Sequence, residues 1–257
     1  MDFQTHIGID YSGAEAPISR LAPLQVYAVT EGREPEPVRT PAAPEGQRWN
    51  WSRKEIADWL IGLARSGQRF IAGIDHAFSF PNSYFDRYKL KDWAQFLDDF
   101  RRHWPTDQPH TYVDFVRDTE PPRTGSGDEL RLVDRRASPA RSVFRFEGHG
   151  TIAKATHAGI PWLRTIRREA GDQVHVWPFD GWDVPESKSV LVEVHAAIVK
   201  QRYPREGRTN YQHAAYSVAR WLSEIDRRGA LAPYFDPPLT DEERRMVARE
   251  GWILGVD

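Results

Sequence analysis

Two short segments of this chain share one pattern, an apolar run that contains a glycine and closes on an aspartate. Ile7-Gly8-Ile9 precedes Asp10, and Ala72-Gly73-Ile74 precedes Asp75. Runs of this kind are typical of strands buried inside an α/β protein. A carboxylate at the end of such a strand is costly to bury unless its charge is compensated. The pattern therefore predicts a sheet of buried strands with acids gathered at strand ends.

The first eighty residues contain further signals for strands and a helix. We predict strands over Phe3 to Asp10, Leu24 to Thr30, Arg48 to Trp51 and Arg69 to Asp75, with an exposed connection over Glu31 to Gln47. A capping box formed by Ser52 and Glu55 predicts a helix before the fourth strand. This order favours a hairpin start that crosses over into a parallel strand.

The rest of the chain is predicted to be mainly helical, with two late strands. Residues 105 to 150 are polar and rich in Pro, Gly and Arg, so we interpret them as an insertion, about 82 to 170 with its flanks, in a single domain of residues 1–257. The predicted elements are a helix over Leu90 to Trp104, a short helix opening at Gly159, strands at Val174 to Pro178 and Ser189 to Val194, a helix over Tyr211 to Arg227 and a final helix capped by Thr240 and Glu243.

Composition excludes several kinds of site. The chain has no cysteine, which removes disulfides, thiolate nucleophiles and cysteine-bound zinc or iron–sulfur centres. Its 257 residues carry a formal net charge of −2, so no overall basic field indicates nucleic acid, although arginines cluster between Arg123 and Arg145. We find no signal segment and no apolar run of about 18 residues, and we expect a cytoplasmic protein without a membrane span.

A third acid, Glu193, lies inside the apolar segment Leu191 to Val194. Divalent cations take carboxylate oxygens as ligands, and two metal ions about 4 Å apart activate water and stabilise the leaving oxygen in phosphodiester hydrolysis. Asp10, Asp75 and Glu193 are therefore candidate ligands for Mg²⁺ or Mn²⁺. The alternative is structural: a strand-terminal aspartate caps a turn, and Glu193 faces solvent on an alternating strand.

Six segments in order carry a resemblance to a known family. They are His6 to Ala14, Ala72 to Pro81, Gly150 to Pro161, Val192 to His195, Gln212 to Ala219 and Glu250 to Gly255. Together they resemble the domain-of-unknown-function-429 family, whose members are classed as predicted ribonuclease H-like nucleases. The resemblance implies a ribonuclease H-like α/β fold with a mixed five-stranded sheet flanked by helices. It also implies that Asp10, Asp75 and Glu193 form the catalytic metal site.

The late helix departs from the family pattern. The family helix carries an Asp where this chain has Ala214, and often another where Tyr211 stands. In ribonuclease H-like enzymes such an acid completes the second metal site, so Ala214 weakens the case for full two-metal catalysis. His213 is adjacent and is a possible fourth ligand or base.

Three further residues lie in the middle segment or close to it. Arg141, Lys154 and His157 are candidate substrate-binding residues, because cations neutralise phosphate charge. The alternative is that Arg141 and Lys154 are solvated cations and that His157 caps the helix near Gly159.

Three functions remain open from the sequence. The first is a metal-dependent nuclease acting on DNA or RNA with Mg²⁺ or Mn²⁺, and the second is a catalytically inactive nucleic-acid-binding or scaffold protein, which Ala214 supports. The third is a phosphotransferase of the actin and sugar-kinase type. That type expects a Gly-rich phosphate loop after the fourth strand, where this chain has His76-Ala77-Phe78.

Overall fold

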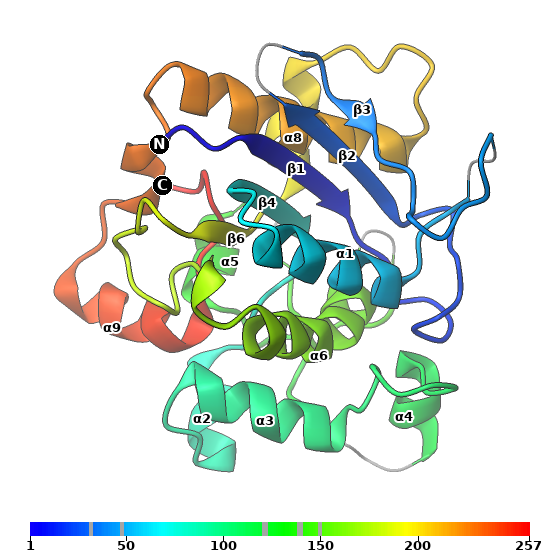
Figure 1. The fold of residues 1–257 in the computed structure, drawn as a ribbon. Coiled ribbons are helices and arrows are strands. Elements are labelled where there is room, and N and C mark those ends of the chain that lie inside the picture. The colour runs from blue at the N-terminus through cyan, green and yellow to red at the C-terminus, as the bar shows by residue number, and fades with distance from the viewer. Residues whose placement is uncertain (31–32, 47–48, 120–122, 138–140, 149–150) are drawn as a thin grey trace.

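The strands of the chain form one mixed sheet of six, in the order β3-β2-β1-β4-β6-β5 (Figure 1). The structure is a computed structural model that describes residues 1–30, 33–46, 49–119, 123–137, 141–148 and 151–257. Helices flank the sheet, so the predicted α/β class is confirmed, with one strand more than the resemblance implied. The strands are β1 (Thr5–Asp10), β2 (Gln25–Thr30), β3 (Glu36–Pro37), β4 (Phe70–Asp75), β5 (Val174–Val176) and β6 (Ser189–Glu193).

The predicted hairpin start and crossover are both present. β2 pairs antiparallel with β1, and β4 then pairs with β1 in parallel. β6 continues the sheet in parallel with β4, and β5 lies at its edge. Because β1, β4 and β6 are parallel, their carboxyl ends lie side by side at the same end of the sheet.

The third strand lies elsewhere than predicted. Arg48 is outside the described residues, and Trp49 to Trp51 are not in a strand; the edge strand β3 lies within the predicted connection. Trp51 is buried and its indole Nε1 donates to the Val38 carbonyl at 3.0 Å. The apolar segment that predicts a strand is therefore a loop, whose Trp51 side chain packs beside the edge strand.

Helices cover both faces of the sheet (Figure 1). α1 (Arg53–Arg65), which begins at the predicted capping box, packs with α6 (Ala153–Ala170) and through it with α3 (Trp93–His103). α8 (Asn210–Arg227) packs on β1, β2 and β4. The remaining helices are α2 (Asn82–Tyr88), α4 (Val113–Thr119), α5 (Leu132–Arg136), α7 (Ala196–Val199) and α9 (Asp241–Glu250).

The two glycines of the repeated strand pattern allow α8 to approach the sheet. A Cβ atom on Gly8 would lie 2.1 Å from the carbonyl oxygen of Ala215, and one on Gly73 would lie 2.7 Å from Val218 Cγ1. No side chain larger than hydrogen fits at Gly8, because the obstacle there is backbone. The glycines therefore fix which sheet face α8 covers, and they place its first turn near the strand ends.

The predicted insertion is largely helical and contributes to the core. Phe96, Phe100 and Trp104 pack in the same cluster as Ile7 and Ile9 of β1. None of the helices among the described residues is long and apolar enough to cross a membrane.

The helix expected to open at Gly159 begins instead at Ala153 and continues through Pro161 to Ala170. Proline lacks the N–H that would bond to the carbonyl four residues earlier, which here belongs to His157. The hydroxyl of Thr106 donates to that carbonyl at 2.7 Å. This distant partner replaces the missing bond, so the helix continues where the local sequence predicts a start.

Candidate functional site

Asp10 and Asp75 lie side by side at the carboxyl ends of two parallel strands. They are register partners in the β1–β4 pair, and both are half-buried. Side chains alternate between the faces of a sheet, so each aspartate shares a face with the glycine two residues before it. Gly8 and Gly73 face α8. Both carboxylates therefore lie on the α8 face, at the end of the sheet where α8 begins.

The proximity of the two acids changes their electrostatics. Burial, the neighbouring Asp75 charge and the opposing Lys200 charge together raise the pKa of Asp10 from 3.8 to about 8. Burial contributes most, the repulsion from Asp75 adds to it, and the Lys200 ammonium offsets part of the increase. The surrounding residues thus compensate a negative charge on Asp10 only in part.

Two basic side chains border this pair of acids. His195, two residues after the end of β6, has its Nδ1 3.8 Å from Asp75 Oδ1, and both side chains are about one-fifth exposed. Lys200 opens the 3₁₀ turn η2 (Lys200–Arg202) that follows α7. Neither residue was singled out as a candidate from the sequence. His195 directly follows Val194 in the resembling segment, which is the signal that pointed to it.

His213 is oriented by other contacts. Its Nε2 donates to the Lys200 carbonyl at 2.9 Å, and its Nδ1 lies 3.4 Å from the Ser217 hydroxyl. These bonds tie the first turn of α8 to η2. The imidazole therefore positions the Lys200 backbone, and the structure gives it no contact with Asp10 or Asp75.

Ala214 occupies the position on α8 that faces the acids. Val218 contacts the Gly73 position, and Ala214 lies one helical turn before Val218 on the same side of the helix. Asp75 lies two residues beyond Gly73 on the same strand face. An acid at position 214 would thus be directed toward Asp75, and this chain has a buried methyl group there.

Glu193 is not brought together with the two aspartates. It pairs with Ile74, one residue before Asp75, so its side chain lies on the opposite face of the sheet. Arg131 binds both of its carboxylate oxygens, Nη2 to Oε1 at 2.6 Å and Nη1 to Oε2 at 2.8 Å. The Phe78 N–H also donates to Oε2 at 2.9 Å. The ligand role implied by the resemblance does not follow from this placement, which is that of a structural ion pair.

Arg131 is the centre of a buried charge network that sequence reasoning missed. Its guanidinium is fully buried and also binds both carboxylate oxygens of Asp134, three residues on. Burial would lower the pKa of Arg131, but Asp134 and Glu193 hold it well above its usual value. Burial raises the pKa of Glu193, and Arg131 opposes that increase. The Arg–x–x–Asp spacing was a local signal for one partner, whereas Glu193 is 62 residues away.

The three predicted substrate-binding residues lie in different surroundings. His157 is completely buried, with its ring centroid 4.3 Å from that of Trp104, and burial lowers its pKa to about 3. Its Nδ1 donates to the Ala153 carbonyl at 2.9 Å, so the imidazole is held against its own helix, α6, within the core. Lys154 pairs with Asp114 at 2.7 Å. Arg141 lines a small pocket together with His195, which places it at the border of the site.

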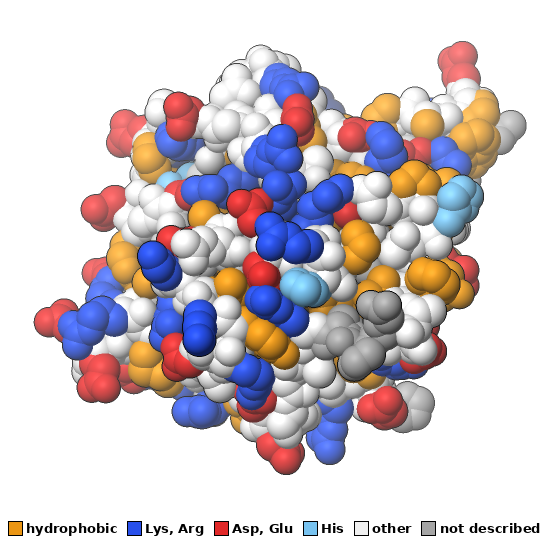
Figure 2. All heavy atoms as spheres, turned by 90° about the horizontal axis from the view of Figure 1, so that it is seen from below, with side chains coloured by type: hydrophobic (Ala, Val, Ile, Leu, Met, Phe, Trp, Pro, Cys, Tyr) orange, Lys and Arg blue, Asp and Glu red, His pale blue; other side chains and the backbone are white. Residues whose placement is uncertain are grey.

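The Arg-rich stretch does not form a continuous basic strip in the described part of the chain. Arg131 is buried, Arg123 pairs with Asp99 at 2.6 Å, and Arg136 pairs with Glu243. Figure 2 shows the face formed by α2, α3 and α4, where Lys and Arg side chains are intermixed with acids. Such a mixed surface lacks the uniform positive charge that phosphate backbones attract.

The aspartate pair fits a magnesium-type ion. Among the described residues, no group of three or more His, Asp or Glu side chains is arranged to enclose a metal ion. Mg²⁺ is commonly held by one or two carboxylates, with water and substrate phosphate oxygens completing its coordination. Asp10 and Asp75 supply two carboxylates, and the raised pKa of Asp10 shows a charge that a cation would stabilise.

Comparisons with known proteins add no relative to this description. No protein-family model, no curated protein and no solved structure matches the chain. The assignment of a function therefore depends on the residues of the site and on their geometry.

Proposed function

We propose that this protein is a metal-dependent phosphodiesterase acting on nucleic acid, with Asp10 and Asp75 holding Mg²⁺ or Mn²⁺. One observation carries the proposal: two carboxylates are register partners on the same face, at the carboxyl ends of adjacent parallel strands. Ligands bind outside the carboxyl ends of strands in open α/β sheets.

A ribonuclease H-like fold is the finer part of this proposal. In its support, the antiparallel strands β3, β2 and β1 are followed by β4 and β6 in parallel, and a long helix, α8, lies over the acids. This agrees with the architecture that the resemblance implies, apart from the extra edge strand β5.

The residues around the pair suggest how hydrolysis proceeds. A divalent ion bound there would activate water and stabilise the charge on the phosphate oxygens. Asp10 and Asp75 fix the position of that charge. Lys200 lies close enough to Asp10 to lower its pKa, so its ammonium is available to a phosphate oxygen beside the pair. His195, next to Asp75 and partly exposed, is placed to give a proton to the leaving oxygen.

A second candidate, binding without hydrolysis, is favoured by Ala214. The family acid that would face Asp75 is replaced by a methyl group, so the site has one carboxylate fewer. In this function the pair binds a metal–phosphate group, and turnover is absent or very slow.

Cleavage of labelled single- and double-stranded DNA and RNA tests the proposal. We expect cleavage that requires Mn²⁺ or Mg²⁺, is abolished by Asp10→Asn and increases with Ala214→Asp. Asp58→Asn is the matched control, because Asp58 is exposed on α1 and pairs with Lys54 on the surface. Activity that appears only with Ala214→Asp would support the binding function for the natural chain. Cleavage that persists in Asp10→Asn, or inert behaviour of every variant, would contradict the nuclease.

A further inference from the structure

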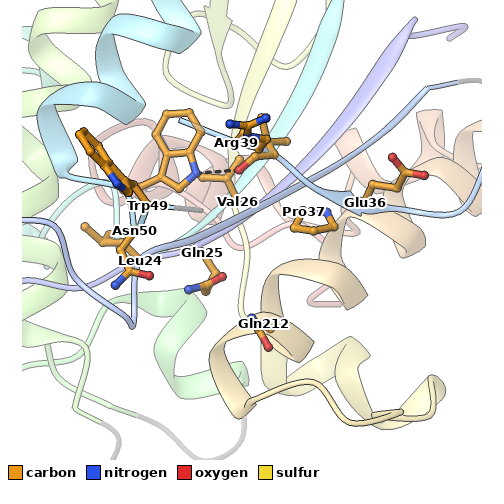
Figure 3. Close-up of a pocket in the computed structure, with 11 residues that line it drawn as sticks. Leu24, Gln25, Val26, Glu36, Pro37, Arg39, Trp49, Asn50 and Gln212 are labelled. Carbon is orange, nitrogen blue, oxygen red and sulfur yellow. Dashed lines mark hydrogen bonds between the residues drawn. The ribbon is translucent and has the colours of Figure 1, made fainter. Parts of the chain in front are cut away.

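A pocket of about 340 Å³ lies at the sheet edge, beyond the end of β3 (Figure 3). It is formed by the start of β2, the strand β3, the segment after residue 48 and the first turn of α8. Its size is in the range of small-molecule sites. Its lining residues are Leu24, Gln25, Val26, Glu36, Pro37, Val38, Arg39, Trp49, Asn50, Trp51 and Gln212.

This pocket adjoins the aspartate pair. Gln25 is the register partner of Asp10 in the β1–β2 hairpin, so their Cα atoms are about 5 Å apart. Directly opposed residues share a face, and both side chains leave the sheet toward α8. Gln212 comes from the same first turn of α8 as Ala214. A group bound in the pocket would therefore lie next to the proposed metal site, separated from Asp10 by the strand β2.

The amides of the pocket have fixed orientations. Gln25 Nε2 donates to the Ala22 carbonyl at 2.7 Å, which leaves Oε1 as the acceptor that this amide offers. Gln212 Oε1 accepts the Thr209 N–H at 2.9 Å in the capping box of α8, so its Nε2 is the donor. In the view of Figure 3, Gln25 lies between Trp49 and Gln212. The pocket thus offers one oriented acceptor and one oriented donor.

An indole forms one wall of the pocket. The side chain of Trp49 is 39% exposed, and the Arg20 guanidinium lies 4.5 Å from its ring centroid. A cation against an aromatic ring restrains the orientation of that ring. Glu36 and Arg39 are the charged lining residues, and their formal charges cancel. A neutral pocket with an aromatic wall suits an uncharged planar heterocycle better than a phosphate.

We propose that this pocket binds a nucleobase, namely the base of the nucleotide next to the phosphate held at Asp10 and Asp75. The inference rests on the proposed function for the identity of that strand. Trp49 stacks on the face of the base, and the Gln25 and Gln212 amides bond to its edge. Stacking is tolerant of base identity, so these amides set whatever preference exists.

Binding measured with Ca²⁺, a divalent ion that also takes carboxylate oxygens as ligands, tests the pocket separately from cleavage. The probes are AMP, CMP, ribose 5-phosphate and a short single-stranded oligonucleotide. The affinity for each is measured by fluorescence anisotropy or calorimetry. We expect Trp49→Ala to weaken oligonucleotide binding at least about fivefold, and Gln25→Ala to change the preference between adenine and cytosine. Tyr112→Ala is the matched control, because Tyr112 is similarly exposed and is absent from the pocket lining. The proposal would be overturned if Trp49→Ala and Gln25→Ala, with folding verified by circular dichroism, bound every probe with the same affinity as the unchanged protein.

The outcomes separate this inference from the proposed function. If binding depends on the base and Trp49→Ala weakens it, but no variant cleaves, the result would support a nucleobase site and contradict the nuclease function. If cleavage requires Asp10 but ribose 5-phosphate binds as tightly as AMP, the result would support the nuclease and overturn the nucleobase site. Tight AMP binding with no gain for the oligonucleotide would assign the pocket to a free nucleotide and overturn the strand-bound base.

Discussion

Replacing Arg131 by methionine tests whether Glu193 belongs to a structural ion pair or to a metal site. The guanidinium is fully buried and makes four hydrogen bonds to the carboxylates of Glu193 and Asp134, of 2.6 to 3.1 Å. Arg131→Met keeps most of the side-chain volume but leaves two buried carboxylates without their cation. Breaking a buried ion pair in this way costs about 3–5 kcal/mol. That is a large part of the roughly 5–15 kcal/mol by which domains are stable.

Urea unfolding at pH 7, followed by tryptophan fluorescence, measures this loss. Arg65→Met is the control, since Arg65 pairs with Glu169 on the surface and both side chains are about half exposed. We expect that control to change the free energy of unfolding by less than about 1 kcal/mol. The contrast between the two arginines separates a buried network from an ordinary surface ion pair.

Glu193→Gln distinguishes the two roles of the glutamate directly. If Glu193 is held by Arg131, the variant is destabilised by about 1–3 kcal/mol, because a charge-assisted bond is weakened, and Mg²⁺ affinity is unchanged. If Glu193 is a metal ligand, the variant loses Mg²⁺ affinity in calorimetry and the metal-free protein becomes more stable. The second result, together with a loss below about 1 kcal/mol for Arg131→Met, would refute the ion-pair assignment.

Three further predictions follow from the buried polar groups. Burial and the Asp75 charge raise the pKa of Asp10 from its usual 3.8 to about 8, so the folded protein favours the protonated carboxyl. Stability therefore falls as pH rises from about 4 to 8. In EDTA, Asp10→Asn should be the more stable protein at pH 8.5, by at most about 6 kcal/mol, with little difference at pH 4. Burial raises the pKa of Asp226, but His6, the N-terminal ammonium and the Phe3 N–H hold it well below its usual range. Its stabilisation is therefore present above about pH 4 and lost on acidification, so Asp226→Asn should cost about 1–3 kcal/mol at pH 7 and less at pH 3 in urea melts. His157→Phe keeps the aromatic packing and should cost less than about 1.5 kcal/mol without changing cleavage rates, whereas a phosphate-binding His157 would lose activity.

Elements specified by adjacent residues could be predicted from the sequence. The helix after Ser52 and the strands that end at Asp10 and Asp75 depend on caps and apolar runs only a few residues long. The start of α6 could not be predicted, because the carbonyl left unpaired by Pro161 finds its donor in Thr106. Sequence patterns report local compatibility, and a compensating contact from 51 positions away leaves no trace in the local pattern.

The candidate site shows the same division. Asp10 and Asp75 were predicted as a pair, and the near-identical segments before them place both residues at the same point of adjacent strands. Glu193 has an equally suitable apolar context, but β6 pairs with β4 so that Glu193 lies opposite Ile74. In a sheet, a shift of one residue moves a side chain to the other face. The register of β6 on β4, which no local pattern specifies, therefore places the Glu193 carboxylate against Arg131, on the sheet face opposite the two aspartates.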